Sequence, residues 1–344
     1  MLPLPARLLS LFFAIPAMVS LLAQNAPVSR NLNESQKLPV FSLVPADTLH
    51  KGRLWVSAGA GAAIYGGLSI ALWKAWYKDF PLTRFHTFND WGEWKNMDKS
   101  GHFFSAYTYS SYSFKGACWT GMKRRNAMWT AIGVGTGIQA TVEMMDGFSQ
   151  GWGFSLGDIA FNTMGVSFFA SQELLWKEQR IIMKVSGKRP DYSKDPLIST
   201  DGGHMTTLDK RAAELYGTSP FHVILKDYNA LTVWGSVNIS SFMNKENSRF
   251  PKWLNVAVGY GAGNLYGGFE NKWTTPDGTV FVLDEEAYPR YRQFYLSPDI
   301  DWSRVPSRHR WVKLALGLLN YVKIPAPVFE LNTLGSVDFH PLRW

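Results

Sequence analysis

The chain has 344 residues, of which 46% are hydrophobic and 15% are aromatic. This composition is sufficient for one large or two ordinary folded domains, and it excludes a chain that is disordered throughout. The net charge of +8 at pH 7 indicates an anionic partner, and the single cysteine excludes an intramolecular disulfide bond.

The first 23 residues have the pattern of a cleaved signal peptide. A basic residue, Arg7, precedes an apolar run from Leu8 to Leu22, and Ala23 is a small residue after which a signal peptidase can cut. We therefore expect export to a bacterial cell envelope, with the mature protein in the periplasm or associated with the outer membrane. Because no cysteine follows the expected cleavage point, we also expect that the protein is not a lipoprotein.

The expected export restricts the anionic partners that a basic protein could meet. We expect membrane lipids or other envelope components as partners, and no nucleic acid, because an exported protein meets anionic headgroups and cell-wall polymers. The sequence names no protein partner.

Four apolar, glycine-rich stretches follow a polar segment at residues 24–50. Their ranges are 54–76, 99–119, 127–145 and 156–176. The first is long enough to span a bilayer, and small residues recur where helices could approach each other closely. These stretches predict a helical bundle over residues 51–183, seated on or in a membrane. The alternative is a soluble helical domain whose glycine-rich helices form its core.

The rest of the chain differs in its residue composition and pattern. Residues 184–220 are polar and contain several prolines and glycines, which predicts a long surface connection. Residues 221–344 mix alternating, β-branched and aromatic residues with turn formers, as strands do. The strand candidates are 231–240, 254–263, 291–301 and 328–340, and a further helix is expected at 311–322. We therefore expect a mainly α protein, in which a bundle of about four glycine-rich apolar helices precedes a smaller β-containing part that is α/β or hairpin-rich.

Acidic, amide and imidazole side chains recur within three of the apolar stretches. They are spaced three or four residues apart, so each set lies on one face of its own helix. Buried polar groups are costly unless they are paired, and these residues therefore mark either a polar core or a functional site. The expected polar cluster contains Asp98, His102, Gln139, Glu143, Asp146, Asp158 and Asn162.

Most of these residues also have an ordinary structural explanation. Asp98 and Asp158 stand where helix N-caps belong, Asp146 can begin a turn, and His102 can be a hydrogen-bonded core histidine. Two carboxylates as close as Glu143 and Asp146 repel each other unless a cation, a proton or donors lie between them. We therefore take Glu143, His102 and Asp146 as the candidate catalytic residues. The sequence assigns neither a metal nor a cofactor.

The order of these residues resembles that of a known family. The motifs, which lie within about residues 45–180, are similar to the signature of the YfiM-like bacterial envelope proteins: Asp98-Lys99-x-x-His102, Glu143-x-x-Asp146-Gly147 and Ser155-Leu156-x-Asp158-x-x-x-Asn162-x-x-Gly165. The same order more distantly resembles VanZ-like membrane proteins. The resemblance implies a predicted periplasmic lipoprotein of unknown function, and it supplies no established catalytic residue. The sequence departs from that family because it lacks the lipoprotein cysteine.

Taken together, these patterns predict an exported, membrane-associated cell-envelope protein of unknown biochemical activity that acts in envelope maintenance. One alternative is an envelope hydrolase or transferase acting on a lipid-linked or headgroup substrate. In that case Glu143 would be the general base and His102 an acid or a metal ligand. A second alternative is a scaffold that docks other envelope proteins through its C-terminal half.

Overall fold

The computed structural model describes residues 38–73, 77, 80–219, 223, 226–243 and 250–344. The signal peptide expected at residues 1–23 lies outside these ranges. The described residues form two compact units, and each unit is assembled from separate stretches of the chain. The first unit includes the chain up to Asp90, residues His102–Arg180 and residues Trp302–Tyr321; the second includes Trp91–Gly101, Ile181–Asp301 and Val322–Trp344.

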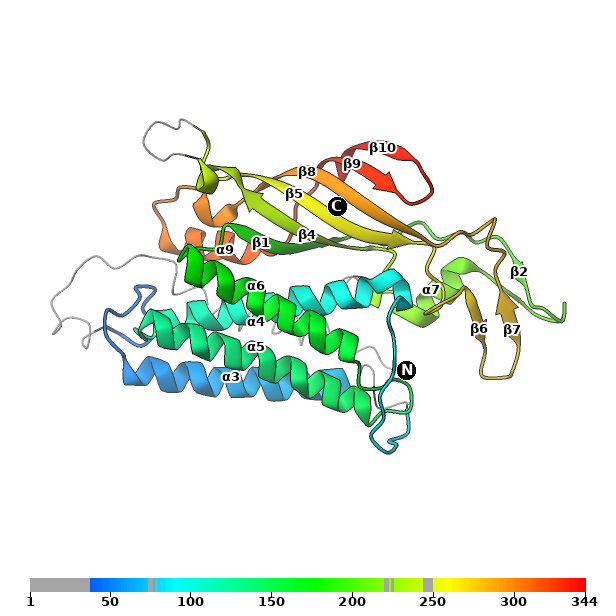
Figure 1. Cartoon of the computed structure of the whole chain (residues 1–344), viewed down its shortest axis with the longest axis horizontal. Coiled ribbons are helices and arrows are strands. Elements are labelled where there is room, and N and C mark those ends of the chain that lie inside the picture. The colour runs from blue at the N-terminus through cyan, green and yellow to red at the C-terminus, as the bar shows by residue number, and fades with distance from the viewer. Residues whose placement is uncertain (1–37, 74–76, 78–79, 220–222, 224–225, 244–249) are drawn as a thin grey trace. The chain divides into compact units, whose positions relative to one another are not determined.

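Long helices build most of the first unit (Figure 1). They are α3 (Lys51–Leu72), α4 (Met97–Trp119), α5 (Arg124–Gly147) and α6 (Leu156–Leu175), followed later in the chain by the 3₁₀-helix η4 (Trp302–Arg304) and by α9 (Arg310–Leu319). All four long helices and α9 were expected from the apolar stretches, and this part of the prediction is confirmed. Within the described ranges, no helix combines the length and the hydropathy needed to cross a bilayer.

Glycine allows α4 and α6 to approach each other closely. A Cβ atom at Gly165 would collide with the carbonyl oxygen of Phe103 and would lie 3.0 Å from the Cβ atom of Ala106. Four of the five glycines of α3, in contrast, have no atom within 4 Å of this position: Gly59, Gly61, Gly66 and Gly67. Close packing at glycine therefore holds at Gly165, and it does not explain these four glycines of α3.

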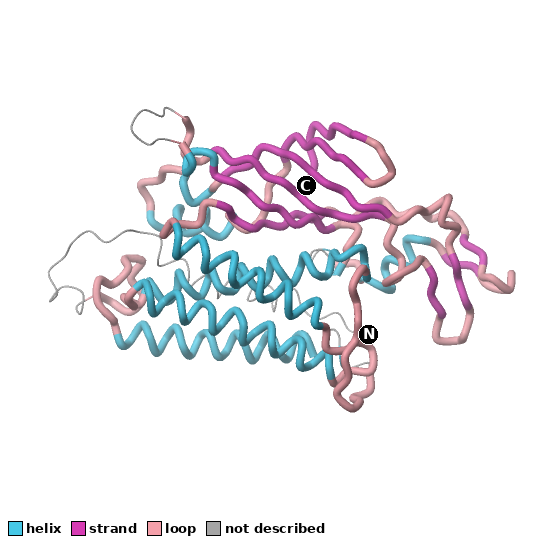
Figure 2. Tube along the Cα trace, viewed as in Figure 1, coloured by secondary structure: helices cyan, strands magenta, loops and turns pink. Residues whose placement is uncertain are grey.

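The second unit contains a six-stranded antiparallel sheet, drawn in magenta in Figure 2, with the strand order β1-β4-β5-β8-β9-β10. Its strands are β1 (Ile181–Gly187), β4 (Leu231–Asn238), β5 (Leu254–Gly263), β8 (Tyr291–Ile300), β9 (Ala326–Asn332) and β10 (Val337–Arg343). Smaller elements complete the unit: two hairpins, β2 (Leu197–Ile198) with β3 (Met205–Thr206) and β6 (Lys272–Thr274) with β7 (Val280–Val282), the helix α7 (Leu208–Tyr216), and the 3₁₀-helices η2 (Glu93–Asn96) and η3 (Ile239–Phe242).

This sheet contradicts the expectation of a mainly α protein, in which a bundle of about four helices would precede a smaller β-containing part. The four strand candidates do contain strands, and the last of them holds two, β9 and β10. The strand β1 was not expected at all. Several strands bury polar side chains, such as Gln293 and Asp299 on β8, so they lack the pattern of apolar residues facing inward. For this reason, the prediction from the sequence underestimated the extent of the sheet.

The buried face of the sheet contains an ion pair. The ammonium of Lys184 lies 2.7 Å from Oδ2 of Asp299, and neither side chain has exposed surface. The same carboxylate oxygen accepts a hydrogen bond from the Ser236 hydroxyl at 2.6 Å, and Asn255 Nδ2 donates to that hydroxyl oxygen at 2.8 Å. Such pairing is what makes buried charges tolerable.

Candidate functional site

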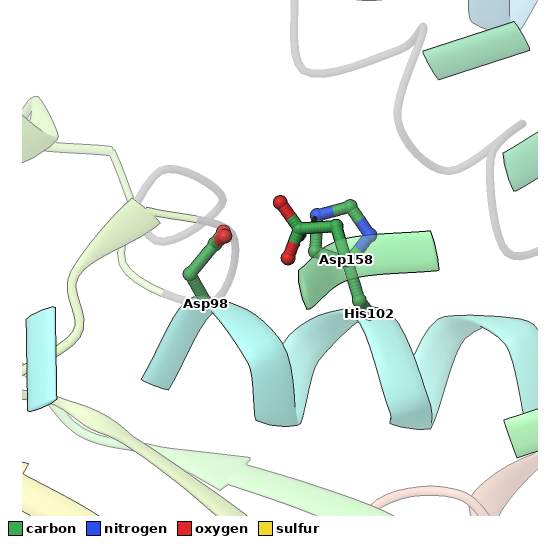
Figure 3. Close-up of side chains that lie close together, drawn as sticks. All are labelled: Asp98, His102 and Asp158. Carbon is green, nitrogen blue, oxygen red and sulfur yellow. Dashed lines mark ion pairs between the residues drawn. The ribbon is translucent and has the colours of Figure 1, made fainter. Parts of the chain in front are cut away.

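The imidazole of His102, on α4, faces side chains from α5 and α6. Its Nδ1 atom lies 3.5 Å from Oε1 of Glu143 and 3.1 Å from Oδ1 of Asn162. Its Nε2 atom lies 3.7 Å from Oδ1 of Asp158, and Figure 3 shows this ring beside the Asp158 carboxylate. Each ring nitrogen therefore faces an acceptor. The side chain of His102 is 15% exposed, whereas that of Glu143 has no exposed surface.

Hydrogen-bond donors surround the buried carboxylate of Glu143. Its Oε2 atom accepts from the backbone N–H of Ser155 at 3.3 Å, and Oε1 accepts from Nδ2 of Asn162 at 3.4 Å. These donors, together with the nearby imidazole, offset the cost of burying a carboxylate. Glu143 is thus held in position on the Nδ1 side of the His102 ring.

Two buried amides hold the histidine in a defined orientation. Nε2 of Gln139 donates to the backbone carbonyl of His102 at 3.1 Å and also to Oδ1 of Asn162. Because an amide oxygen only accepts, Nδ1 of His102 carries the proton in its contact with Asn162. The other ring nitrogen, Nε2, lies on the side of Asp158.

The start of α6 places Asp158. Ser155 is the N-cap residue, and its hydroxyl oxygen accepts from the backbone N–H of Asp158 at 3.0 Å. Asp158 therefore lies in the first helical turn, where the helix dipole favours a negative charge, and is not the cap itself. The Ser155 hydroxyl in turn donates to Oδ1 of the buried Asp90 at 2.6 Å.

Sequence reasoning did not select Ser155 or Asp90 as members of the cluster. The Ser155-x-x-Asp158 spacing is a capping-box-like signal that could have identified the serine. Asp90 lies 65 residues before Ser155 and outside the four apolar stretches, so no local pattern marks it.

Two of the expected cluster residues have hydrogen-bond partners elsewhere. Asp98 lies in the first turn of α4, one turn before His102 (Figure 3), and its Oδ1 accepts from the Tyr228 hydroxyl at 2.8 Å. Asp146 lies near the end of α5, and its Oδ1 accepts from the Tyr77 hydroxyl at 2.6 Å. The side chains that the structure brings together around His102 are Gln139, Glu143, Asp158 and Asn162.

The donor atoms around His102 fit two kinds of chemistry. His102 and Asp158 each offer an atom that a divalent cation could bind. Carboxylates and imidazoles are common ligands of zinc. A histidine flanked by carboxylates is also the arrangement that proton transfer requires.

A groove of about 240 Å³ lies between α5 and α6. Its lining combines the aliphatic side chains of Ile132, Ile159 and Val166 with the cluster amides of Gln139 and Asn162. Because both amides are hydrogen-bonded to His102, a molecule in this groove would contact the residues that hold the histidine.

Residues 87–172 match a protein family described as "Predicted periplasmic lipoprotein (DUF2279)". All seven residues of the expected polar cluster lie in the matched stretch. The match supports a periplasmic family of unknown function, and it does not carry the YfiM-like or VanZ-like names. No curated protein and no solved structure matches the chain.

This match contradicts the expectation that the protein is not a lipoprotein. That expectation depended on a cleavage point inferred within residues 1–23, which lie outside the described residues. Over residues 87–172, the chain is similar to a family of predicted periplasmic lipoproteins of unknown function.

Proposed function

We propose that this protein is a membrane-associated component of the bacterial cell envelope that acts in envelope maintenance, and that His102 is the centre of its functional site. The observation that supports this proposal is the position of His102 between two carboxylates with part of its ring exposed. A core histidine needs one hydrogen-bond partner for each ring nitrogen. His102 faces Glu143, Asp158 and Asn162, which is more than packing alone requires.

The proposed location in the cell envelope is supported by different observations. The matched family is described as periplasmic. The three motifs of the helical stretch resemble those of YfiM-like envelope proteins, and their order more distantly resembles that of VanZ-like membrane proteins. Both resemblances favour a site of action at a bacterial membrane.

Complementation tests the role of His102. In a strain that lacks this protein, the wild-type chain should restore growth in the presence of a detergent or of an antibiotic that acts on the cell wall. His102→Ala and Glu143→Gln should each abolish this restoration while immunoblots show unchanged protein abundance. Glu214→Gln, at an exposed position on α7, is the matched control and should restore growth fully. Full restoration by both cluster variants, or loss of abundance in both, would contradict the proposal.

The groove between α5 and α6 favours a second candidate function, a hydrolase or transferase acting on a lipid-linked or headgroup substrate. Its aliphatic residues, Ile132, Ile159 and Val166, suit an acyl chain, and the amides of Gln139 and Asn162 suit a polar group. A lipid with its chain in the groove would place its polar end near the residues that contact His102.

In this second candidate, His102 is the residue that touches the reacting atoms. Nε2 would take a proton from water while the water oxygen forms a bond to the ester carbonyl carbon or to the phosphorus atom. The departing alcohol oxygen would then receive that proton as its bond breaks. Glu143 would stabilise the charged imidazole from the Nδ1 side, and its complete burial fits a positioning residue better than a base that contacts substrate.

Product analysis tests the enzymatic candidate directly. The full chain would be incubated with phosphatidylglycerol vesicles, and released fatty acid and glycerol phosphates would be measured by mass spectrometry. The wild-type chain should form product, His102→Ala should form none, and Glu143→Gln should reduce kcat by a factor of about 100. Product formation that is unaffected by His102→Ala would exclude this mechanism.

A further inference from the structure

One face of the six-stranded sheet is apolar and exposed. Val258, Leu296, Phe329 and Phe339 are successive cross-strand partners on β5, β8, β9 and β10, and each is between 49% and 57% exposed. A second row beside them follows the same four strands and consists of Tyr260, Phe294, Leu331 and Val337. We call these eight residues the apolar face. They form a continuous patch because cross-strand partners are in side-chain contact.

The opposite side of the same strands is buried, and it carries polar residues beside a small apolar cluster that includes Ala257, Tyr295 and Val328. Gln293, Ser297 and Asp299 of β8 are no more than 6% exposed, and Glu330 of β9 is 5% exposed. An antiparallel sheet with one side in water normally turns its apolar residues inward and its polar residues outward. Here the exposed side is apolar, and the buried side mixes polar with apolar residues. A continuous exposed apolar patch of this kind marks an interaction site.

Cations border one end of the apolar face. Arg292 precedes Phe294 by two residues on β8, so both side chains lie on the same side of the sheet. The Tyr260 hydroxyl donates to the backbone carbonyl of Lys95, which places Lys95 at this end of the second row. Burial, together with the nearby charges of Arg290 and Arg292, lowers the pKa of Lys95, and the smaller effect of Glu285 opposes this shift.

This combination of side chains restricts the class of partner. Aromatic and aliphatic residues next to basic residues match the interface of a bilayer, where apolar side chains reach the acyl region and cations meet anionic headgroups. A second copy of the chain could cover the apolar residues, but its own face would bring the same cations. An anionic membrane accounts for both features.

We infer that the apolar face of the sheet binds the surface of a bilayer that contains anionic lipids. This inference deepens the membrane association in the proposed function, but it is independent of the site at His102. The two can therefore fail separately, because they depend on different residues in different units.

Flotation with vesicles tests the inference. The full chain would be mixed with vesicles of phosphatidylethanolamine and phosphatidylglycerol, and the bound fraction would be compared with that of a Leu296→Ser, Phe329→Ser double variant. Both side chains are about half exposed, so the variant should keep its fold, as circular dichroism would check. We expect its affinity for the vesicles to fall at least about tenfold, because two apolar contacts with the membrane are removed.

Three controls make the result specific. Val282→Ser removes a similarly exposed apolar side chain on β7, outside the apolar face, and should leave binding unchanged. His102→Ala should also bind like the wild type. Vesicles of phosphatidylcholine alone should bind the wild type more weakly, because they lack anionic headgroups. An acyl anchor on the chain would contribute equally to wild type and variants.

Two results would overturn the inference. The first is equal vesicle binding by the wild type and the Leu296→Ser, Phe329→Ser variant. The second is a wild-type dimer, seen by analytical ultracentrifugation, that the same double variant dissociates while neither protein binds vesicles. The second result would assign the apolar face to a contact between copies. If vesicle binding failed while complementation still required His102, the inference would fall and the proposed site would stand.

Discussion

The Nδ1 atom of His102 lies 3.5 Å from Oε1 of Glu143, a carboxylate with no exposed surface. The two residues belong to different helices, α4 and α5, so their contact depends on how these helices pack. Because Glu143 also accepts hydrogen bonds from Ser155 and Asn162, it connects the histidine to α6 and to the chain that leads into it. A change at Glu143 should therefore affect both stability and function.

The stability effect of Glu143→Gln is the first prediction. Glutamine has the same shape but replaces one acceptor oxygen by an amide nitrogen, so one of the two donors to Glu143 loses its partner. We expect the free energy of unfolding in urea to fall by about 1 to 3 kcal/mol. Glu214→Gln should change it by less than about 0.5 kcal/mol. Equal stability of the two variants would contradict the buried hydrogen bonds described for Glu143.

A second prediction concerns the close approach of α4 and α6 at Gly165. In Gly165→Ala the new Cβ atom would meet the backbone carbonyl of Phe103, which cannot rotate away as a side chain would. We expect a loss of about 1 to 3 kcal/mol in the free energy of unfolding. Gly133→Ala is the matched control in α5, where a Cβ atom has no neighbour within 4 Å. It should stabilise the protein by about 0.5 to 1 kcal/mol, because alanine favours helix more than glycine does. Stabilisation by both substitutions would contradict the helix packing.

The pH dependence of stability in the second unit gives a third prediction. The pKa of Lys323 is lowered from 10.5 to about 8, because the effect of burial outweighs the opposing charge of Asp299 and the charge of Lys184 adds a smaller lowering. Between these two pH values the unfolded chain holds a proton that the folded chain has lost. Stability from this group therefore rises as pH rises from 8 to 10.5, and below pH 8 the cost of charging the buried lysine is fully present.

A comparison of the wild type with Lys323→Met isolates this effect. Methionine cannot be charged, so the stability of the variant relative to wild type should decrease as pH rises through this window. We expect the change to be about 1 to 3 kcal/mol. Urea unfolding of both proteins across the window measures it. A stability difference that stays constant with pH would show that Lys323 does not titrate in this way.

The sequence predicted the helices and most of the site because helical periodicity is local. Residues three or four apart share a helix face, so His102, Glu143 and Asn162 could each be placed on a polar stripe. Gln139 and Asp158 followed from the same spacings. How the stripes meet depends on contacts such as that between Gly165 and Phe103, which no local spacing reports.

Contacts between distant residues limited the rest of the site prediction. Asp146 and Asp98 lie at the expected positions on their helices, but their partners Tyr77 and Tyr228 are 69 and 130 residues away in the chain. Asp90 was missed for the same reason. Donors were one of the expected remedies for repulsion between Glu143 and Asp146, and the structure gives each carboxylate a donor of its own.

The sheet was underestimated because its exposed side is apolar while its buried side carries many polar residues. Strand β8 buries Gln293 and Asp299 and exposes Phe294 and Leu296, so its sequence does not identify the side that faces the interior. The segment of residues 328–340 was read as one strand, but the chain turns at Gly335, whose φ of 89° favours glycine, and continues as β10.

Functional coupling between His102 and Glu143 tests most directly whether they act as one centre. The measurement is growth under detergent stress of cells that carry His102→Ala, Glu143→Gln or both substitutions, with each chain at wild-type abundance. If Glu143 acts only through the imidazole, the double variant should be no more impaired than the more impaired single variant. Wild-type growth with either single variant, or a double variant whose impairment is the product of the two single effects, would contradict a shared centre at His102.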